Sequence, residues 1–301
     1  MNFSIGLDIG GTKIAGAVFA GDGGEIERVI LPTPADYADF LSVCVTIIER
    51  LDQACGARAS VGLGLPGAVA AKTELLPTMA NIACLSRKPL QSDLQEKLNR
   101  SVRLANDADC AALSEATDGA GAGCRSVFGL IMGTGVGGGL VVDGKLVQGA
   151  NGLTGEVGHL PLPFREPADG PVVPCNCGQS GCIDKSASGP ALLRQYKVLS
   201  GKTLKASPQV ADLARQGDEG ALATLDRFYT TVAKAMVPVL HMFDPEIIVV
   251  SGGLNNLPGL YKDVPERWGR YAMIPNLKTQ FVPAKHGALS GLRGAAWVGK
   301  F

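Results

Sequence analysis

The sequence predicts an α/β protein built from two domains. The chain has 301 residues, which is enough for two hydrophobic cores. Segments with strand and helix patterns alternate along it. A similar loop, in which a turn of glycine and threonine joins two strands, occurs once in each half, near residues 8–12 and 132–138. Such a repeat favours two related halves.

The glycine-rich stretch 119–123 marks the expected boundary between the domains and a hinge for their movement. We expect a small N-terminal domain over residues 1–118, completed by the C-terminal helix 288–301. The large domain is expected over residues 119–287.

Composition excludes several classes of protein. Lys and Arg number 28, as do Asp and Glu, so the formal net charge is zero and no nucleic-acid or membrane partner is expected. No apolar run is long enough for a membrane span, and no leader precedes the first strand. A cytoplasmic location follows as an expectation. In the cytoplasm, we expect the cysteines to be free thiols or metal ligands rather than partners in disulfides.

In the first half, polar residues follow the carboxyl ends of predicted strands, where α/β sheets bind their ligands. Gly67 follows the strand 60–65, and Asn106 and Asp107 follow the strand 102–105. One of these two residues could simply cap the next helix. Alternatively, the two acidic residues and the amide at this edge include a general base with an orienting neighbour. The other elements predicted in this half are strands at 5–9 and 14–20 and helices at 38–55, 90–98 and 111–116.

In the second half, a buried strand at 247–250 ends in Gly252 and Gly253, a turn that suits close approach of a nucleotide. The other predicted strands are 127–132, 140–142 and 281–284. Helices are predicted at 189–199, 210–214, 221–241 and 287–298, with an interruption at Pro238.

The two glycine/threonine loops are the candidate phosphate site. Turns of this kind expose backbone N–H groups that can hold phosphate oxygens. Asp8, at the end of the first strand, could orient a hydrated Mg²⁺. The residues expected to bind the nucleotide are Asp8, Ile9, Gly10, Gly11, Thr12, Lys13, Gly133, Thr134, Gly135, Val136, Gly137, Gly138, Gly139, Gly252 and Gly253.

A candidate metal site consists of His159, Cys175, Cys177 and Cys182. One imidazole and three thiolates match the ligands and the tetrahedral coordination that Zn²⁺ prefers. Four protein ligands leave no open position, so we expect a structural zinc ion. Glu156 and Asp184 bracket this set. They either support the metal ligands or face a polar ligand.

Taken together, these motifs resemble the ROK family of sugar kinases and repressors, within the actin/hexokinase superfamily. The resemblance covers essentially the whole chain. It rests on residues 8–13, 104–108, 133–139, 154–159 and 175–182.

The resemblance implies a two-domain actin/hexokinase-like (ribonuclease H-like) fold with a cleft between the domains. It implies ATP-dependent phosphorylation of N-acetyl-D-glucosamine at the 6-hydroxyl, giving N-acetylglucosamine 6-phosphate and ADP. ATP with Mg²⁺ and a structural Zn²⁺ are the implied cofactors, and a homodimer the implied assembly. N-acetylmannosamine and glucose are the alternative substrates. A sugar-sensing repressor is a remote alternative, because Asp8 lies too near the N-terminus for a DNA-binding segment to precede it.

The same resemblance assigns roles to the remaining residues. Asp107 becomes the base that takes the proton of the sugar 6-hydroxyl. Asn106, Glu156 and His159 hold sugar hydroxyls, and His159 also binds zinc. Gly67 and Asn81 belong to the sugar pocket. Asp184 stands where the family usually has the longer Glu, so its contact with the sugar should be longer or mediated by water.

Overall fold

The structure is a computed structural model, and it describes residues 2–67, 69, 75–79 and 82–300. The chain divides into two compact units. Unit 1 comprises Met1–Gly123, Gly139–Thr154 and Ala288–Phe301, and unit 2 comprises Cys124–Gly138 and Gly155–Gly287. The C-terminal helix thus belongs with the N-terminal strands. Residues 139–154 also belong to unit 1, although we expected them in the large domain. The boundary at residue 118 stays a prediction.

Unit 1 is built on a five-stranded sheet with the strand order β3-β2-β1-β4-β5. β1 pairs antiparallel with β2, and β2 with β3, whereas β1, β4 and β5 run parallel. Parallel pairing brings the carboxyl ends of β1, β4 and β5 to one edge of the sheet. The strands are β1 (Ser4–Ile9), β2 (Lys13–Phe19), β3 (Glu25–Pro32), β4 (Ser60–Leu65) and β5 (Val102–Asn106). β3 was not predicted.

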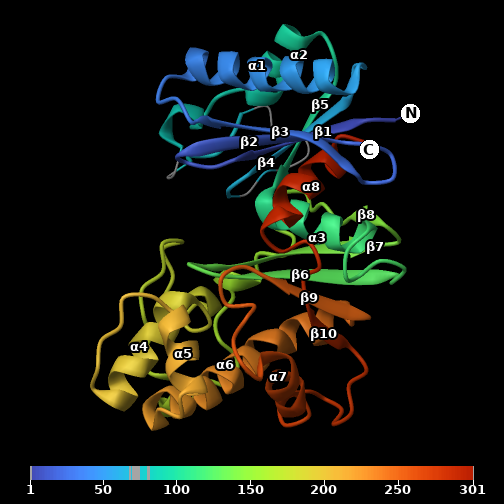
Figure 1. Cartoon of the computed structure of the whole chain (residues 1–301). Helices are drawn as coiled ribbons and strands as arrows, with labels where there is room; N and C mark the ends of the chain where they lie inside the picture. Colours follow the sequence, from blue (N-terminus) through green and yellow to red (C-terminus); the bar gives the residue numbers. More distant parts are fainter. Residues whose placement is uncertain (1, 68, 70–74, 80–81, 301) are drawn as a thin grey trace. The chain divides into compact units, whose positions relative to one another are not determined.

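Helices cover both faces of this sheet (Figure 1). α1 (Tyr37–Cys55) and α2 (Leu90–Leu98) lie on one face, and α3 (Asp107–Thr117) and α8 (Ser290–Val298) lie on the other. Two glycines let α8 sit directly on the strands. A Cβ on Gly6 would lie 2.2 Å from the carbonyl oxygen of Leu292, and one on Gly62 would lie 2.1 Å from that of Ala295. Any side chain at either position would therefore push the helix away.

The second sheet has the strand order β10-β9-β6-β7-β8. β9 pairs in parallel with both β6 and β10, so the ends of β6 and β9 also share an edge. The strands are β6 (Ser126–Met132), β7 (Val136–Val142), β8 (Lys145–Leu146), β9 (Ile247–Ser251) and β10 (Gln280–Pro283).

The helices of unit 2 are α4 (Gly189–Ser200), α5 (Pro208–Arg215), α6 (Glu219–Phe243) and α7 (Leu260–Trp268). Aromatic pairs hold two of them on the sheet. The rings of Phe128 on β6 and Phe243 on α6 stack with centroids 6.1 Å apart, and Trp268 on α7 meets Phe281 on β10 at 5.6 Å. α6 continues through Pro238, where the sequence suggested an interruption.

Short 3₁₀ segments complete the fold: η1 (Ala83–Leu85), η2 (Val157–His159), η3 (Pro167–Asp169), η4 (Ile183–Lys185) and η5 (Gly287–Leu289). Among the described residues, no helix combines the length and the apolar character that a membrane span requires.

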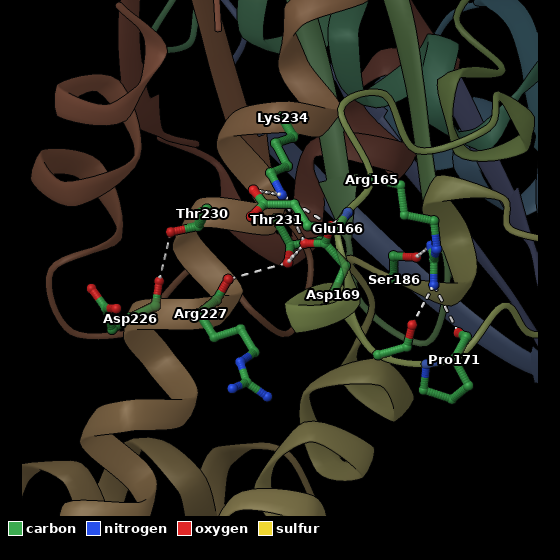
Figure 2. A network of polar contacts seen from close by, with 11 residues as sticks. Arg165, Glu166, Asp169, Pro171, Ser186, Asp226, Arg227, Thr230, Thr231 and Lys234 are labelled. Atoms are coloured by element: carbon green, nitrogen blue, oxygen red, sulfur yellow. Dashed lines mark hydrogen bonds and ion pairs between the residues drawn. The ribbon is translucent and has the colours of Figure 1, made fainter. Parts of the chain in front are cut away.

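A buried lysine pins the loop between His159 and Cys175 to α6 (Figure 2). Only 1% of the Lys234 side chain is exposed, and its Nζ donates to Glu166 at 2.8 Å and to the two oxygens of Asp169 at 2.9 and 3.1 Å. Burial alone would lower the pKa of Lys234, but the hydrogen bonds to these carboxylates outweigh it and raise the pKa above its usual value. These two ion pairs therefore fix to α6 the loop that joins the candidate metal ligands His159 and Cys175.

We predict that Lys234→Met lowers the free energy of unfolding by about 3–5 kcal/mol, because Asp169 would remain buried without its cation. Adding Asp169→Asn should restore most of this loss, since no buried charge then remains unpaired. Urea denaturation measures both. Lys262→Met, at an exposed lysine of α7, is the matched control. Equal stability of Lys234→Met and this control would contradict the assignment.

Candidate active site and metal centre

The carboxyl edge of the unit 1 sheet gathers the first group of predicted site residues. Asp8 on β1 is paired in register with Gly64 on β4, and Gly64 with Ala105 on β5. Asn106 and Asp107 follow directly at the β5–α3 junction. Asp8, Asn106 and Asp107 therefore lie at the same edge of the unit 1 sheet, although Asp8 is far from the other two in the sequence.

Asn106 ties three segments together at this edge. Its Oδ1 accepts the backbone N–H groups of Ala108 at 2.7 Å and Asp109 at 3.4 Å, so it is the N-cap of α3. Its Nδ2 donates to the carbonyl oxygen of Gly67 at 2.7 Å. The capping interpretation is therefore correct for Asn106. The cap also holds the loop after β4 against the start of α3.

Asp107 is the first residue of α3, which begins there rather than at residue 111 as we predicted. Its Oδ1 accepts the Ala108 N–H at 2.8 Å. The positive end of the helix dipole stabilises a carboxylate in this first turn. Three carboxylates surround the neighbouring Cys110: burial raises the pKa of its thiol well above the usual value, and Asp109, Asp107 and Asp8 raise it further.

The first glycine/threonine loop is a tight turn between β1 and β2. The Gly10 N–H donates to the Lys13 carbonyl oxygen at 3.0 Å, and Gly11, Thr12 and Lys13 are exposed. Burial raises the pKa of Asp8, and the nearby Lys13 partly opposes this shift. An exposed turn with a carboxylate and a lysine beside it suits a phosphate bound with a divalent cation.

The second loop, between β6 and β7, is fixed by contacts from two other segments of unit 2. Asp184 Oδ1 accepts the Val136 N–H at 2.9 Å, and the Gly133 carbonyl oxygen accepts the N–H of Gly189, the first residue of α4, at 2.7 Å. A Cβ on Gly135 would lie 2.7 Å from Asp184 Oδ1. Asp184 thus supports the loop directly, a role that we did not predict.

Gly252 and Gly253 lie beside the second loop. Ser251, the last residue of β9, pairs with Ile131 of β6. Gly252 has a φ of +89°, and a Cβ there would lie 2.4 Å from the Met132 carbonyl oxygen. Only glycine fits this turn, which places the predicted nucleoside segment next to the second predicted phosphate loop.

Gly139, the last residue of that loop, packs in unit 1 against the first turn of α3. A Cβ there would lie 2.9 Å from the Asp109 Cα. Of the predicted phosphate-loop residues 133–139, Gly139 therefore lies near the first turn of α3 within unit 1.

The four predicted metal ligands form a cluster in unit 2. The ligand atoms of His159, Cys175, Cys177 and Cys182 all lie within 4.8 Å of one another. His159 Nδ1 is 3.6 Å from Cys175 Sγ, and Cys177 Sγ is 3.6 Å from Cys182 Sγ. A tetrahedral zinc ion with Zn–S bonds of about 2.3 Å places sulfur atoms about 3.8 Å apart. The cluster therefore fits such an ion.

Backbone hydrogen bonds hold the ligand-bearing segments together. The Ile183 N–H donates to the Leu160 carbonyl oxygen at 2.8 Å, and the Leu162 N–H donates to that of Gly181 at 3.1 Å, so the segment after His159 lies beside Cys182. Burial raises the pKa of Cys182 to about 12, and Cys177 and Cys175 add to this rise. A bound metal must therefore displace a thiol proton.

Glu156 lies on the far side of the His159 ring from the cysteines. Its Oε2 is 3.8 Å from His159 Nε2. Burial raises the pKa of Glu156, and His159 partly counteracts this. With Nδ1 toward the sulfur atoms, the other ring nitrogen and this carboxylate can bind a polar ligand.

Asn81 and Gly67 are the other two residues predicted for the sugar pocket. Asn81 lies outside the described residues. Gly67 contributes a carbonyl oxygen that already accepts a hydrogen bond from Asn106.

Sequence reasoning missed two lysines. Lys185 pairs with Asp184 at 3.0 Å, and Lys234 pairs with Asp169. A single lysine within the apolar run 232–237 was the available signal for a buried ion pair.

The chain is similar to known proteins over almost its whole length. The model of the ROK family matches residues 4–300. The chain is 39% identical over 298 residues to an N-acetyl-D-glucosamine kinase of Salmonella newport, covering 97% of this chain and 98% of that protein.

Two solved structures are similar over nearly the whole length. The ROK hexokinase of Thermus thermophilus has a TM-score of 0.86 and 32% identity, covering 98% of this chain and 97% of that one. The ROK family glucokinase of Streptomyces griseus, in complex with glucose and AMPPNP, has a TM-score of 0.76 and 26% identity, covering 99% of each chain. The two-domain α/β fold of ROK sugar kinases is confirmed, and this chain belongs to the ROK family.

Proposed function

We propose that the protein transfers the γ-phosphoryl group of ATP to the 6-hydroxyl of N-acetyl-D-glucosamine, giving N-acetylglucosamine 6-phosphate and ADP. The observation that carries this proposal is the 39% identity over 97% of the chain to a relative named N-acetyl-D-glucosamine kinase. The position of Asp107 directly after β5, at the carboxyl ends of the parallel strands β1, β4 and β5, supports it.

Asp107 is the proposed general base. Phosphoryl transfer needs an acceptor oxygen that is held in line and loses its proton as the bond to phosphorus forms. The hydrogen bond from the Ala108 N–H fixes the Asp107 carboxylate, and the cap by Asn106 fixes the turn that carries it. A carboxylate held in this way can accept the proton with little rearrangement.

The two glycine/threonine loops are the proposed phosphate sites. The phosphate would be bound by backbone N–H groups within residues 10–13 and 133–139 other than those of Gly10, Gly133 and Val136, which already have acceptors. Lys13 would supply a cation. Mg²⁺ bound with ATP would lie near Asp8, where it would neutralise phosphate charge. Gly252 and Gly253 would approach the nucleoside. Support comes from the exposure of the first turn and from the contacts that hold the second.

Glu156 and His159 are proposed to hold sugar hydroxyls, with His159, Cys175, Cys177 and Cys182 around a structural zinc ion. All four ligand positions are then filled by the protein, so the metal supplies no bound water for chemistry. Its contribution is to fix the His159 ring. The longer or water-mediated contact of Asp184 with the sugar stays a proposal, beside the hydrogen bond that its Oδ1 accepts from the Val136 N–H. A cytoplasmic location and a homodimer also stay proposals.

The general-base assignment predicts that Asp107→Asn lowers kcat by roughly 10²–10⁴-fold with N-acetylglucosamine, because the amide cannot accept the proton. The KM values for ATP and sugar should change little. A coupled assay of ADP release measures this, and Asp212→Asn, at an exposed carboxylate, is the control. Turnover of Asp107→Asn near that of the control would refute the assignment. Absence of ADP release by the unaltered protein would refute the function.

The zinc assignment predicts one zinc ion per chain in the purified protein. Cys177→Ser should lose it and raise the KM for the sugar by about tenfold or more, because His159 is no longer held. Metal analysis and sugar titration measure the two effects. Cys55→Ser, at a cysteine outside the cluster, should keep both properties. Full zinc content in Cys177→Ser would exclude this ligand set.

A further inference from the structure

A cavity in unit 2 lies between α4, α6 and the loop that Lys234 anchors. Its volume is about 280 Å³, near the lower end of the range for small-molecule sites. α4 contributes Arg194, Gln195 and Lys197, α6 contributes Arg227, and the loop contributes residues 167–171. Figure 2 labels four of the lining residues, namely Asp169, Pro171, Ser186 and Arg227. Among the residues that the structure describes, none that belongs to the proposed ATP or sugar sites lines the cavity.

Positive charge predominates among the lining side chains. Lys185, Arg194, Lys197 and Arg227 are cationic, and Asp169 is the single acidic residue. The charge of Asp169 is already compensated by Lys234. Within the described part of the chain, the charged groups of Lys197 and Arg227 have no hydrogen bond or ion pair. In Figure 2 the Arg227 guanidinium extends away from the Lys234 cluster.

Two further features indicate the kind of ligand. Apolar side chains, including those of Pro167, Val173 and Val198, form much of the remaining wall. Gln195 is 8% exposed, and its Oε1 is buried without a hydrogen-bond partner. A buried acceptor without a donor is unfavourable, and a ligand with an N–H or O–H group would satisfy it.

We propose that this cavity is an effector site for a small organic phosphate. The phosphate group binds Arg227 and Lys197, the apolar body packs against the proline and valine side chains, and an N–H or O–H group donates to Gln195. Arg groups bind phosphate through charge-assisted hydrogen bonds, which gives the site its preference for anions.

Lys185 connects this cavity to the second phosphate loop. It lines the cavity, and its Nζ is 3.0 Å from Asp184 Oδ2. Asp184 Oδ1 in turn accepts the Val136 N–H at 2.9 Å. An anion in the cavity competes with Asp184 for Lys185, and the less compensated Asp184 charge then opposes phosphate at the loop. The effector should therefore raise the KM for ATP, a consequence that rests on the proposed function of the loop.

Isothermal titration with 4-aminophenyl phosphate tests the site, in the presence of saturating sugar and ADP so that the proposed active site is occupied. We expect one probe per chain, and roughly tenfold or greater weakening by Arg227→Gln and by Lys197→Gln. Arg103→Gln, at an exposed arginine of unit 1, should bind like the unaltered protein. 4-Aminobenzyl alcohol, which lacks the phosphate, should not bind. Thermal melting confirms that each variant is folded.

Absence of saturable binding, or equal affinity in all variants, would overturn the proposal. Binding is measured without turnover, so a protein that binds the probe but transfers no phosphate would refute the kinase function and not the site. In the kinetic arm, the probe should raise the KM for ATP at least about threefold in the unaltered protein and not in Lys185→Met. Probe binding with an unchanged KM for ATP would overturn the coupling through Lys185.

Discussion

The hydrogen bonds of Asn106 are the constraint on which the arrangement of the candidate site residues in unit 1 depends. One side chain joins the loop after β4, through Gly67, to the first turn of α3, through Ala108 and Asp109. Asp107 lies between these anchors, so its position follows from the cap. Because β1, β4 and β5 are parallel and in register, the same edge also receives Asp8. The helix cap formed by Asn106 is therefore compatible with the catalytic role that we propose for the neighbouring Asp107.

Unit 2 follows a similar plan with different anchors. The second loop is held by Asp184, two residues after Cys182, and by Gly189 at the start of α4. The segment from His159 to Cys182 carries the four candidate metal ligands and is fixed to α6 by Lys234. Lys185 pairs with Asp184, and this contact carries the coupling that we propose between the cavity and the loop.

Several features of the fold and of the candidate site were predictable because they depend on residues that are close together in the sequence. The strand-turn-strand loops, the spacing of the cysteines and the polar residues after strands 60–65 and 102–105 are all visible in short windows. Other features depend on contacts between distant segments. The bond from Val136 to Asp184 spans 48 positions, and the pair of Lys234 with Asp169 spans 65. The strand β3, whose exposed and buried residues do not alternate cleanly, was also missed. The early start of α3 was missed because the capping bonds of Asn106 cannot be seen from hydrophobic periodicity.

The central claim is that these two groups of residues phosphorylate an amino sugar on its 6-hydroxyl. The most direct test measures kcat/KM for N-acetylglucosamine, N-acetylmannosamine and glucose with ATP, and locates the phosphate on the product by ³¹P–¹H NMR. Our account predicts the highest kcat/KM for N-acetylglucosamine, by about tenfold or more over the other two sugars, and a phosphate on oxygen 6. A higher kcat/KM for N-acetylmannosamine or glucose, or a phosphate on another oxygen, would contradict it.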